Sequence, residues 1–166
     1  MATETAIALE EYLQTSYEGV DREYVDGEVV ERAMPDLFHS RVQQAFATIF
    51  GPLIQSKGIE ALAELRVRLA EDRVRIPDYC VFAERQTERF PSTPPLVAVE
   101  IVSLDDLYST LIQKLGEYHA WGVRHVWLVD PYQKRLSVFD QHGLRSVEKY
   151  ELPALGLTIE PGDLFD

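Results

Sequence analysis

The fold of this chain is decided by one apolar stretch, which reads Leu96-Val97-Ala98-Val99-Glu100-Ile101-Val102. The side chains of a strand alternate between two faces. Here both faces are apolar, which is typical of a central strand covered on both sides. A helical pattern follows over 105–121, and a second apolar strand follows over Val123–Val129. This order of strand, helix and strand predicts a mixed sheet with helices packed on it.

Three ionisable residues occur where these patterns favour apolar ones. Glu100 interrupts the central strand, Asp78 lies in another apolar segment, and Lys114 lies in the helix over 105–121. At about 100° per residue, Lys114 falls about 20° from Leu107, in the middle of the apolar stripe of that helix. Because a lone buried carboxylate or ammonium is costly, we expect these three groups to be paired or to bind a metal.

Two carboxylates and a lysine are the smallest set of side chains for a phosphodiesterase that uses a divalent metal. Mg²⁺ prefers oxygen ligands and is usually held by one or two carboxylates together with water and substrate phosphate. We therefore expect Asp78 and Glu100 to hold Mg²⁺ or Mn²⁺, and Lys114 to stabilise charge that builds up on the phosphate. Purely structural roles stay open for two of these residues. Lys114 can extend its ammonium past the edge of the core into solvent, and Asp78 can accept backbone hydrogen bonds in a turn or at a strand end.

The remaining elements follow from periodicity and turn residues. The pair Asp26-Gly27, between Tyr24-Val25 and Val29-Val30, predicts a type I′ hairpin. Alternation over Leu62–Leu69, and again over Arg73–Phe82, predicts an antiparallel hairpin with one solvent-exposed face. The other expected elements are helices over 5–16 and from near Asp36 to Gly58, a hairpin over 134–139 and 144–150, and a short edge strand over 155–159.

Four of the 16 basic residues fall within ten positions, at Arg66, Arg68, Arg73 and Arg75. Two interpretations of this cluster are open. The arginines either form a local patch that faces phosphate, or they are the solvated face of the expected hairpin.

Composition limits the class of protein. A chain of 166 residues predicts a single domain spanning 1–166, long enough to bury a core. No apolar run approaches the roughly 20 residues of a membrane span, and the N-terminal residues do not resemble a secretory signal, so we expect no membrane partner. The single cysteine, Cys80, excludes an internal disulfide and is expected to be a small core residue. These observations predict a cytoplasmic protein.

The chain is strongly acidic, with 16 basic and 28 acidic residues and a formal net charge of −12. This balance argues against a protein that coats nucleic acid through a generally positive surface. It leaves local contact with nucleic acid open.

Several quoted segments form an ordered set along most of the chain, from about Leu9 to Ile159. The set is Glu23-Tyr-Val-Asp-Gly27, His39, Pro77-Asp78, Val99-Glu100-Ile-Val-Ser103, Lys114 with Tyr118, and Trp127-Leu-Val-Asp-Pro131. It resembles the Uma2 family, formerly a domain of unknown function, which is assigned to the PD-(D/E)XK nuclease superfamily.

The resemblance implies a restriction-endonuclease-like α/β core, with a mixed β-sheet flanked by helices and a Mg²⁺-dependent nuclease site. Asp78 and Glu100 would be the metal carboxylates and Lys114 the catalytic lysine, which lies on the next helix instead of two residues after Glu100. Glu23 would match an upstream acid of the family, and His39 a residue at a helix entrance near the cleft.

The chain departs from the family pattern beside the expected site. Similar chains usually have Ser-Pro-Ser where this one has Ser103-Leu104-Asp105, and an aspartate where this one has Thr110. The first hypothesis is a Mg²⁺-dependent endonuclease acting on DNA. The second is a non-catalytic homodimeric interaction module that retains the fold, since exposed strands near the C-terminus make a homodimer plausible. Hydrolysis of RNA or of a nucleotide is a third hypothesis.

Overall fold

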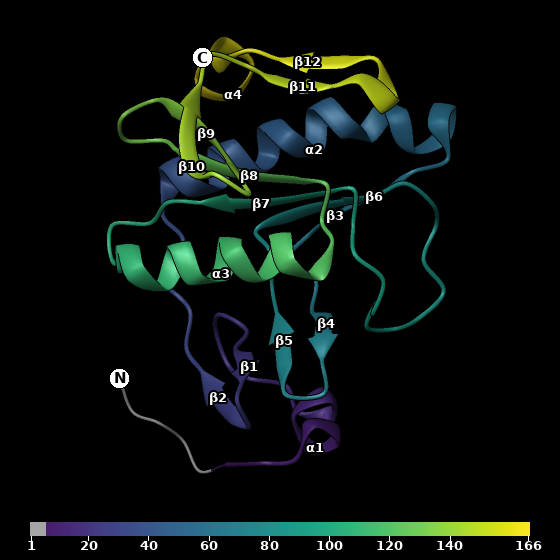
Figure 1. Ribbon diagram of the computed structural model, residues 1–166, viewed down its shortest axis with the longest axis vertical. Helices are drawn as coiled ribbons and strands as arrows, with labels where there is room; N and C mark the ends of the chain where they lie inside the picture. The colour runs from purple at the N-terminus through teal and green to yellow at the C-terminus, as the bar shows by residue number, and fades with distance from the viewer. Residues whose placement is uncertain (1–5) are drawn as a thin grey trace.

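A computed structural model of the chain describes residues 6–166 and contains three sheets, with helices on both faces of the largest one (Figure 1). The helices are α1 (Leu9–Gln14), α2 (Leu37–Lys57), α3 (Tyr108–Trp121) and α4 (Pro161–Phe165), with one 3-10 turn, η1 (Pro153–Leu155). The strands are β1 (Glu23–Val25), β2 (Glu28–Val30), β3 (Glu60–Ala63), β4 (Val67–Ala70), β5 (Arg73–Arg75), β6 (Tyr79–Phe82), β7 (Val97–Ile101), β8 (His125–Asp130), β9 (Arg135–Asp140), β10 (Gly143–Val147), β11 (Tyr150–Leu152) and β12 (Leu157–Ile159).

The largest sheet has six strands in the order β10-β9-β8-β7-β6-β3. β7 and β8 run parallel, with Glu100 opposite Leu128, and the other neighbours run antiparallel. The helix α3 makes the crossover that two consecutive parallel strands require. The expected mixed sheet is confirmed, with the stretch around Glu100 near its centre.

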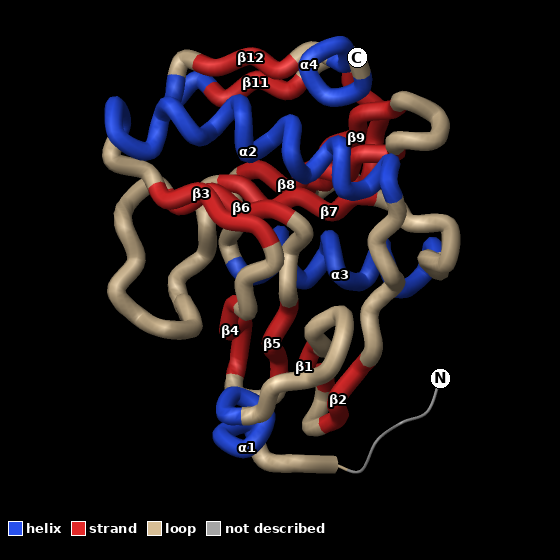
Figure 2. Tube along the Cα trace, turned by 180° about the vertical axis from the view of Figure 1, so that it is seen from behind, coloured by secondary structure: helices blue, strands red, loops and turns tan. Residues whose placement is uncertain are grey.

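Two helices cover the two faces of this sheet, α2 on one and α3 on the other (Figures 1 and 2). Phe46 and Phe50 of α2 pack against Tyr79 and Trp127 of the sheet, with ring centroids 5.7 to 6.4 Å apart. Full burial of a side chain such as Phe46 stabilises the fold by about 1.5–3 kcal/mol. Because both faces are covered, every residue of β7 is buried, which accounts for its apolar sequence.

A second sheet, with the strand order β2-β1-β5-β4, lies below α3 in Figure 1 and has α1 at its far end. Its first hairpin turns at Asp26 and Gly27, whose φ angles are 53° and 84°. Positive φ at both central residues is what a type I′ turn needs, so the predicted hairpin is confirmed.

The expected hairpin of 62–69 and 73–82 is wrong as a single unit, because each half is divided between two sheets. β3 and β6 pair in the six-stranded sheet, whereas β4 and β5 pair in the four-stranded one. The first half breaks at Glu64, which has a φ of 56°. The second breaks at Pro77, which has no N–H to donate to a strand ladder. The second break places Asp78 at the junction of the two sheets.

The remaining expected elements need smaller corrections. The helix expected over 105–121 begins at Tyr108, and the one expected over 5–16 spans 9–14, with residue 5 lying outside the described residues. The expected strand 144–150 is divided between β10 and β11. The tail strand, β12, is an edge strand as expected, and it pairs with β11 in a two-stranded sheet.

Within residues 6–166, no helix is both long enough and apolar enough to cross a bilayer.

Candidate functional site

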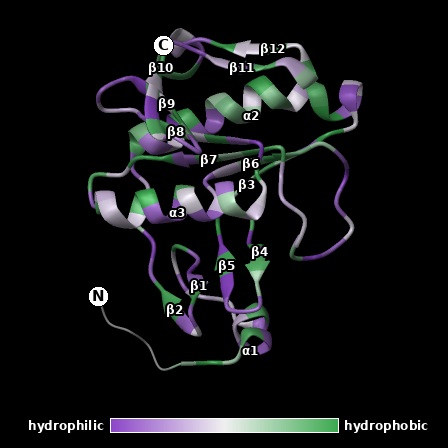
Figure 3. Ribbon diagram, in the orientation of Figure 1, coloured by the Kyte–Doolittle hydropathy of each residue, from purple (hydrophilic) through white to green (hydrophobic). Residues whose placement is uncertain are grey.

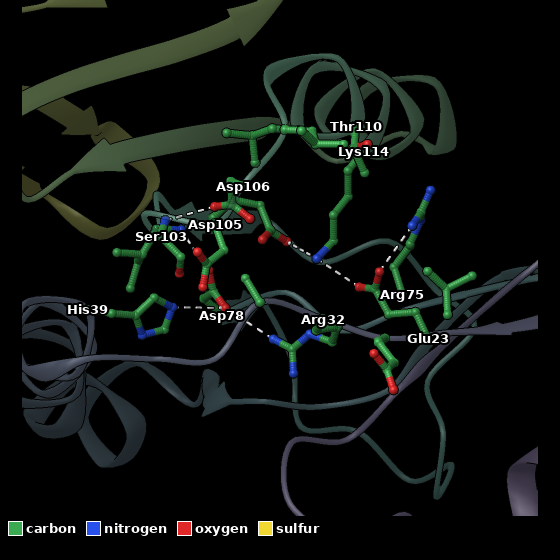
Figure 4. A pocket seen from close by; sticks show the side chains of 17 residues that line it. Glu23, Arg32, His39, Arg75, Asp78, Ser103, Asp105, Asp106, Thr110 and Lys114 are labelled. Carbon is green, nitrogen blue, oxygen red and sulfur yellow. Dashed lines mark hydrogen bonds and ion pairs between the residues drawn. The ribbon is translucent and has the colours of Figure 1, made fainter. Parts of the chain in front are cut away.

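The five residues predicted from sequence lie around one cavity of about 270 Å³ (Figure 4). They come from separate elements, and the cavity lies at the junction of the two larger sheets, α2 and α3. The residues are Glu23 of β1, His39 of α2, Asp78 between β5 and β6, Glu100 of β7 and Lys114 of α3. The structure therefore brings all five to one place, although they span more than half of the chain.

Lys114 lies on the inward face of α3, which it shares with Leu111, Leu115 and Tyr118 at helical spacing. Its side chain is 9% exposed. The ammonium Nζ lies 2.7 Å from Oε1 of Glu23 and 2.9 Å from Oε1 of Glu100. The open alternative, an ammonium extended past the core edge into water, is therefore wrong for this lysine.

Glu100 receives two hydrogen bonds, and both go to Oε1. The donors are the Lys114 ammonium and the Tyr118 hydroxyl, at 2.9 and 2.8 Å. Burial raises the pKa of Glu100 to about 8. Lys114 opposes this shift, and the negative charges of Asp78 and Glu23 add to it. The neutral form of the Glu100 carboxyl is therefore favoured up to about pH 8.

Asp78 is fixed on both carboxylate oxygens. Oδ1 accepts hydrogen bonds from Arg32 Nη2 at 3.1 Å and from His39 Nε2 at 3.2 Å. Oδ2 accepts one from the backbone N–H of Ile101 at 2.7 Å, which ties Asp78 to the end of β7 beside Glu100. Burial acts to raise the pKa of Asp78, but the hydrogen bond from His39 and the charge of Lys114 outweigh burial and lower it. The ionised carboxylate is therefore the favoured form.

His39 lies in the first turn of α2, where Asp36 caps the helix by accepting the His39 backbone N–H at 2.9 Å. Burial acts to lower the pKa of His39, yet its bond to Asp78 prevails and raises it. The other ring nitrogen, Nδ1, is buried and has no hydrogen-bond partner among residues 6–166. The geometry thus makes His39 a support for Asp78.

Glu23 holds Lys114 from the side opposite Glu100. Its Oε1 accepts the Lys114 ammonium and the Ile76 N–H at 2.8 Å, and its Oε2 accepts Arg75 Nη1 at 3.0 Å. Although burial acts to raise the pKa of Glu23, the charges of Lys114 and Arg75 keep it below the ordinary value. Lys114 therefore lies between two carboxyl groups, that of Glu23 with a lowered pKa and that of Glu100 with a raised pKa.

Two further residues of the cavity were not found from the sequence. Arg32 is almost fully buried and bonds both Asp78 and Glu64, the latter at 2.6 Å. Asp106 accepts the Ser103 backbone N–H at 2.7 Å, and burial together with the charge of Asp78 raises its pKa. Both lie in connections between elements, where no periodic pattern reveals which way a side chain points.

The arginine cluster needs a correction, since neither interpretation of it fits three of its four members. Arg66 and Arg75 are buried, and β5, which carries Arg73 and Arg75, appears hydrophilic in Figure 3 although it packs beside α3. The partners are Asp21 for Arg66, Asp26 and Glu117 for Arg73, and Glu23 and Glu117 for Arg75. These arginines are used in ion pairs between elements. Arg66, Arg73 and Arg75 therefore form neither a phosphate-facing patch nor a solvated face, whereas the half-buried Arg68 keeps both interpretations open.

The donor set at the cavity fits a hard divalent cation. Asp78 and Glu100 offer carboxyl oxygens, and a cation bound beside Glu100 would favour its ionised form over the neutral form that burial favours. Within residues 6–166, no three His, Cys, Asp or Glu side chains are grouped so as to hold a metal by themselves. A cation bound there would therefore take further ligands from water and substrate, as Mg²⁺ commonly does.

Comparison with known proteins agrees with this architecture. Residues 9–165 match the family model described as "Uma2: Putative restriction endonuclease". The structure resembles the "crystal structure of a putative nuclease belonging to DUF820" from Anabaena variabilis ATCC 29413, with a TM-score of 0.82 and 22% sequence identity. The alignment covers 96% of this chain and 97% of that one, so the predicted α/β fold is confirmed. No curated protein matches the chain.

Proposed function

The chain belongs to the Uma2 family, and from that premise we propose that it is a Mg²⁺-dependent endonuclease that hydrolyses DNA phosphodiester bonds. One observation carries the proposal. The Lys114 ammonium lies 2.9 Å from Glu100 in the same cavity as the ionised Asp78. This arrangement brings one cation and two carboxylates together where a phosphate and a metal ion can meet.

Asp78 and Glu100 would hold Mg²⁺ or Mn²⁺. When bound, the ion supplies positive charge that polarises the phosphoryl group and activates water. The Lys114 ammonium stabilises negative charge that develops on the phosphate, and it does so from a fixed, largely buried position. Its two anionic neighbours keep it protonated, because they raise the pKa of Lys114 against the effect of burial.

Three other side chains act as positioning residues in this proposal. Glu23 holds the lysine ammonium from the side away from Glu100. His39 and Arg32 both bond Oδ1 of Asp78, so they set the direction in which that carboxylate faces. A catalytic group held in this way loses little entropy when substrate binds.

A non-catalytic homodimeric interaction module is the competing function, and one observation favours it. The buried charges of the cavity already form ion pairs with one another, through Lys114 with Glu23 and Glu100, and through Arg32 with Asp78. Such a set can serve as structure alone. The acidic net charge of −12 points the same way, because it disfavours general binding to DNA.

Metal uptake separates the two functions. We expect calorimetric titration with Mn²⁺ to show one site in the wild type, and loss of that site in Asp78→Asn and in Glu100→Gln. The matched control is Glu28→Gln, which changes an exposed carboxylate on β2 and should bind Mn²⁺ as the wild type does. A wild-type protein that takes up neither Mn²⁺ nor Mg²⁺ would favour the interaction module.

Cleavage is the second measurement. Nicking of supercoiled plasmid DNA should require Mg²⁺ or Mn²⁺ and should disappear in Lys114→Gln, whose Mn²⁺ titration shows whether the site is still formed. Lys57→Gln, at the exposed end of α2, is the control and should cut at the wild-type rate. Labelled RNA of the same sequence, run in parallel, tells DNA cleavage from RNA cleavage.

A further inference from the structure

Apolar side chains gather on the surface next to the cavity. Of the eight large apolar side chains that are exposed within residues 6–166, six lie in two connections, and we call them the apolar rim. They are Met34, Leu37 and Phe38, where β2 leads into α2, and Leu104, Leu107 and Tyr108, where β7 leads into α3. Leu104 is 78% exposed and Tyr108 70%. Such a concentration of exposed apolar surface marks a binding surface more often than chance.

Tyr132, in the turn after β8, lies beside the rim. The Tyr132 ring meets Phe38 edge-on at 5.7 Å, and its hydroxyl donates to Asp36 Oδ2 at 2.5 Å. Both connections lie on the same side of the molecule in Figures 1 and 2. Tyr132 therefore packs against the first half of the rim, and the two halves lie on the same side of the molecule.

This surface borders the candidate site directly. Leu107 of the rim lines the cavity, as do its neighbours Asp105 and Asp106, which Figure 4 shows beside Asp78. A phosphodiester seated at Asp78 and Glu100 would thus place its flanking nucleotides against the rim. Continuity with the cavity makes the rest of the substrate the natural occupant of the apolar surface.

The charges around the cavity select among possible substrates. A DNA duplex carries about one negative charge per 1.7 Å of its length and is held mainly by Lys and Arg. The buried cations of the cavity are already paired, and the chain as a whole has a net charge of −12. Apolar and aromatic side chains recognise the faces of bases, which are open only in unpaired strands.

We propose that the apolar rim receives unpaired bases of a DNA strand on either side of the scissile phosphate. The substrate of the site is then single-stranded or locally opened DNA and not an intact duplex. Phe38 and Tyr108 provide the stacking faces. Two exposed cations are placed for contact with the strand's phosphates: Arg41, one turn after Phe38, and Lys134, in the turn that holds Tyr132. The inference rests on the proposed nuclease function for its substrate phosphate.

The test is fluorescence anisotropy with a labelled 20-nucleotide oligothymidylate and with a duplex of the same length, first in EDTA and then with Ca²⁺. We expect the wild type to bind the single strand at least about tenfold more tightly than the duplex. The double variant Phe38→Ala/Tyr108→Ala should lose about tenfold or more of its single-strand affinity, since stacking on an aromatic ring contributes about that much per base.

Controls keep the experiment interpretable. Ile54→Ala removes an exposed apolar side chain from the far end of α2, and it should bind the oligonucleotide as the wild type does. Because Phe38 and Tyr108 are exposed, the double variant should unfold at the wild-type temperature in circular dichroism. Its Mn²⁺ uptake should also be unchanged, which separates the rim from the metal site.

Each other outcome has a defined meaning. Equal or tighter binding of the duplex, or unchanged single-strand affinity in the double variant, overturns the proposal. A wild-type dimer that the double variant converts to monomer, with no oligonucleotide bound by either, also overturns it and assigns the rim to self-association. Rim-dependent single-strand binding, without Mg²⁺- or Mn²⁺-dependent cleavage of either the oligonucleotide or the plasmid, supports the rim and counts against the nuclease function. Nicking without strand preference counts against the rim alone.

Discussion

Two groups of buried charge in this protein look alike and differ in how they are balanced. In the first, which we call the Arg66 cluster, Arg66 bonds both oxygens of Asp21 at 2.6 and 2.7 Å, donates to two backbone carbonyls, and lies over the Tyr12 ring at 4.3 Å. In the second, which we call the Lys114 cavity, Lys114 faces two carboxylates at once. The Lys114 cavity is the drier of the two, since the Asp21 side chain is 35% exposed, and only the Lys114 cavity holds a carboxyl with a strongly raised pKa.

The pKa shifts express this difference. At Arg66, burial acts to lower the pKa, and the hydrogen bond to Asp21 outweighs it. At Glu100, burial raises the pKa to about 8, and Lys114 does not outweigh it. This difference shows that a charged side chain whose polar atoms all have hydrogen-bond partners, such as Arg66, stabilises the structure. A buried carboxyl with a strongly shifted pKa in a cavity is instead a candidate for binding and catalysis.

The largest expected effect tests the structural half of this comparison. Arg66→Ala should lower the free energy of unfolding by about 2 kcal/mol, because it leaves two carbonyls and the partly solvated Asp21 without their partner. Urea denaturation measures the loss. Arg68→Ala, in the neighbouring strand β4, is the control and should change stability by less than about 0.5 kcal/mol. If the folded Arg66→Ala variant binds Mn²⁺ less tightly than the wild type, the Arg66 cluster is not separate from the Lys114 cavity, which contradicts this comparison.

A smaller effect tests the raised pKa of Glu100. Its carboxyl has a folded pKa of about 8 instead of the ordinary 4.5, so its contribution to stability is present below about pH 4.5 and is lost as pH rises to about 8. In EDTA, Glu100→Gln should therefore gain stability relative to the wild type as pH rises across that window. Urea unfolding at several pH values measures it. Glu28→Gln is the control. If the free energy of unfolding changes with pH in the same way in the wild type and in Glu100→Gln, the pKa of Glu100 is not raised by folding.

The smallest expected effect adds a charge to the Lys114 cavity. Thr110 lines the cavity one turn before Lys114, where similar chains usually carry an aspartate. Thr110→Asp should raise Mn²⁺ affinity by about threefold, since an added carboxylate near a cation contributes a fraction of a kcal/mol when partly solvated. Titration calorimetry measures the change. Thr48→Asp, on the exposed side of α2, should bind as the wild type does. Weaker binding in Thr110→Asp would show that a cation does not sit within reach of α3.

Much of the fold was predictable because it depends on local patterns. The apolar β7, the stripe that turns Lys114 inward and the Asp26-Gly27 turn are each readable within a few residues, since side-chain direction follows the period of the element. The position of Glu100 in an apolar strand was by itself a strong signal. The catalytic and metal-binding roles given to these residues stay predictions.

The parts that were not predictable depend on contacts between distant residues. Arg32 meets Asp78, 46 positions away, and Arg66 meets Asp21, 45 positions away. Nothing in the alternation over 62–69 or 73–82 shows that each segment crosses from one sheet to the other. The hairpin and arginine predictions failed for this reason, because a periodic pattern states that one face is covered but not what covers it.

The sequence by itself therefore determined which segments are strands and helices, and which of their faces are buried, because backbone geometry and apolar periodicity act over a few residues. Only the tertiary structure decided which charges meet, which arginines are neutralised, and where exposed apolar side chains gather beside the cavity. Burial and partners set the free energy of a charge, and both depend on chain segments that are far apart in sequence.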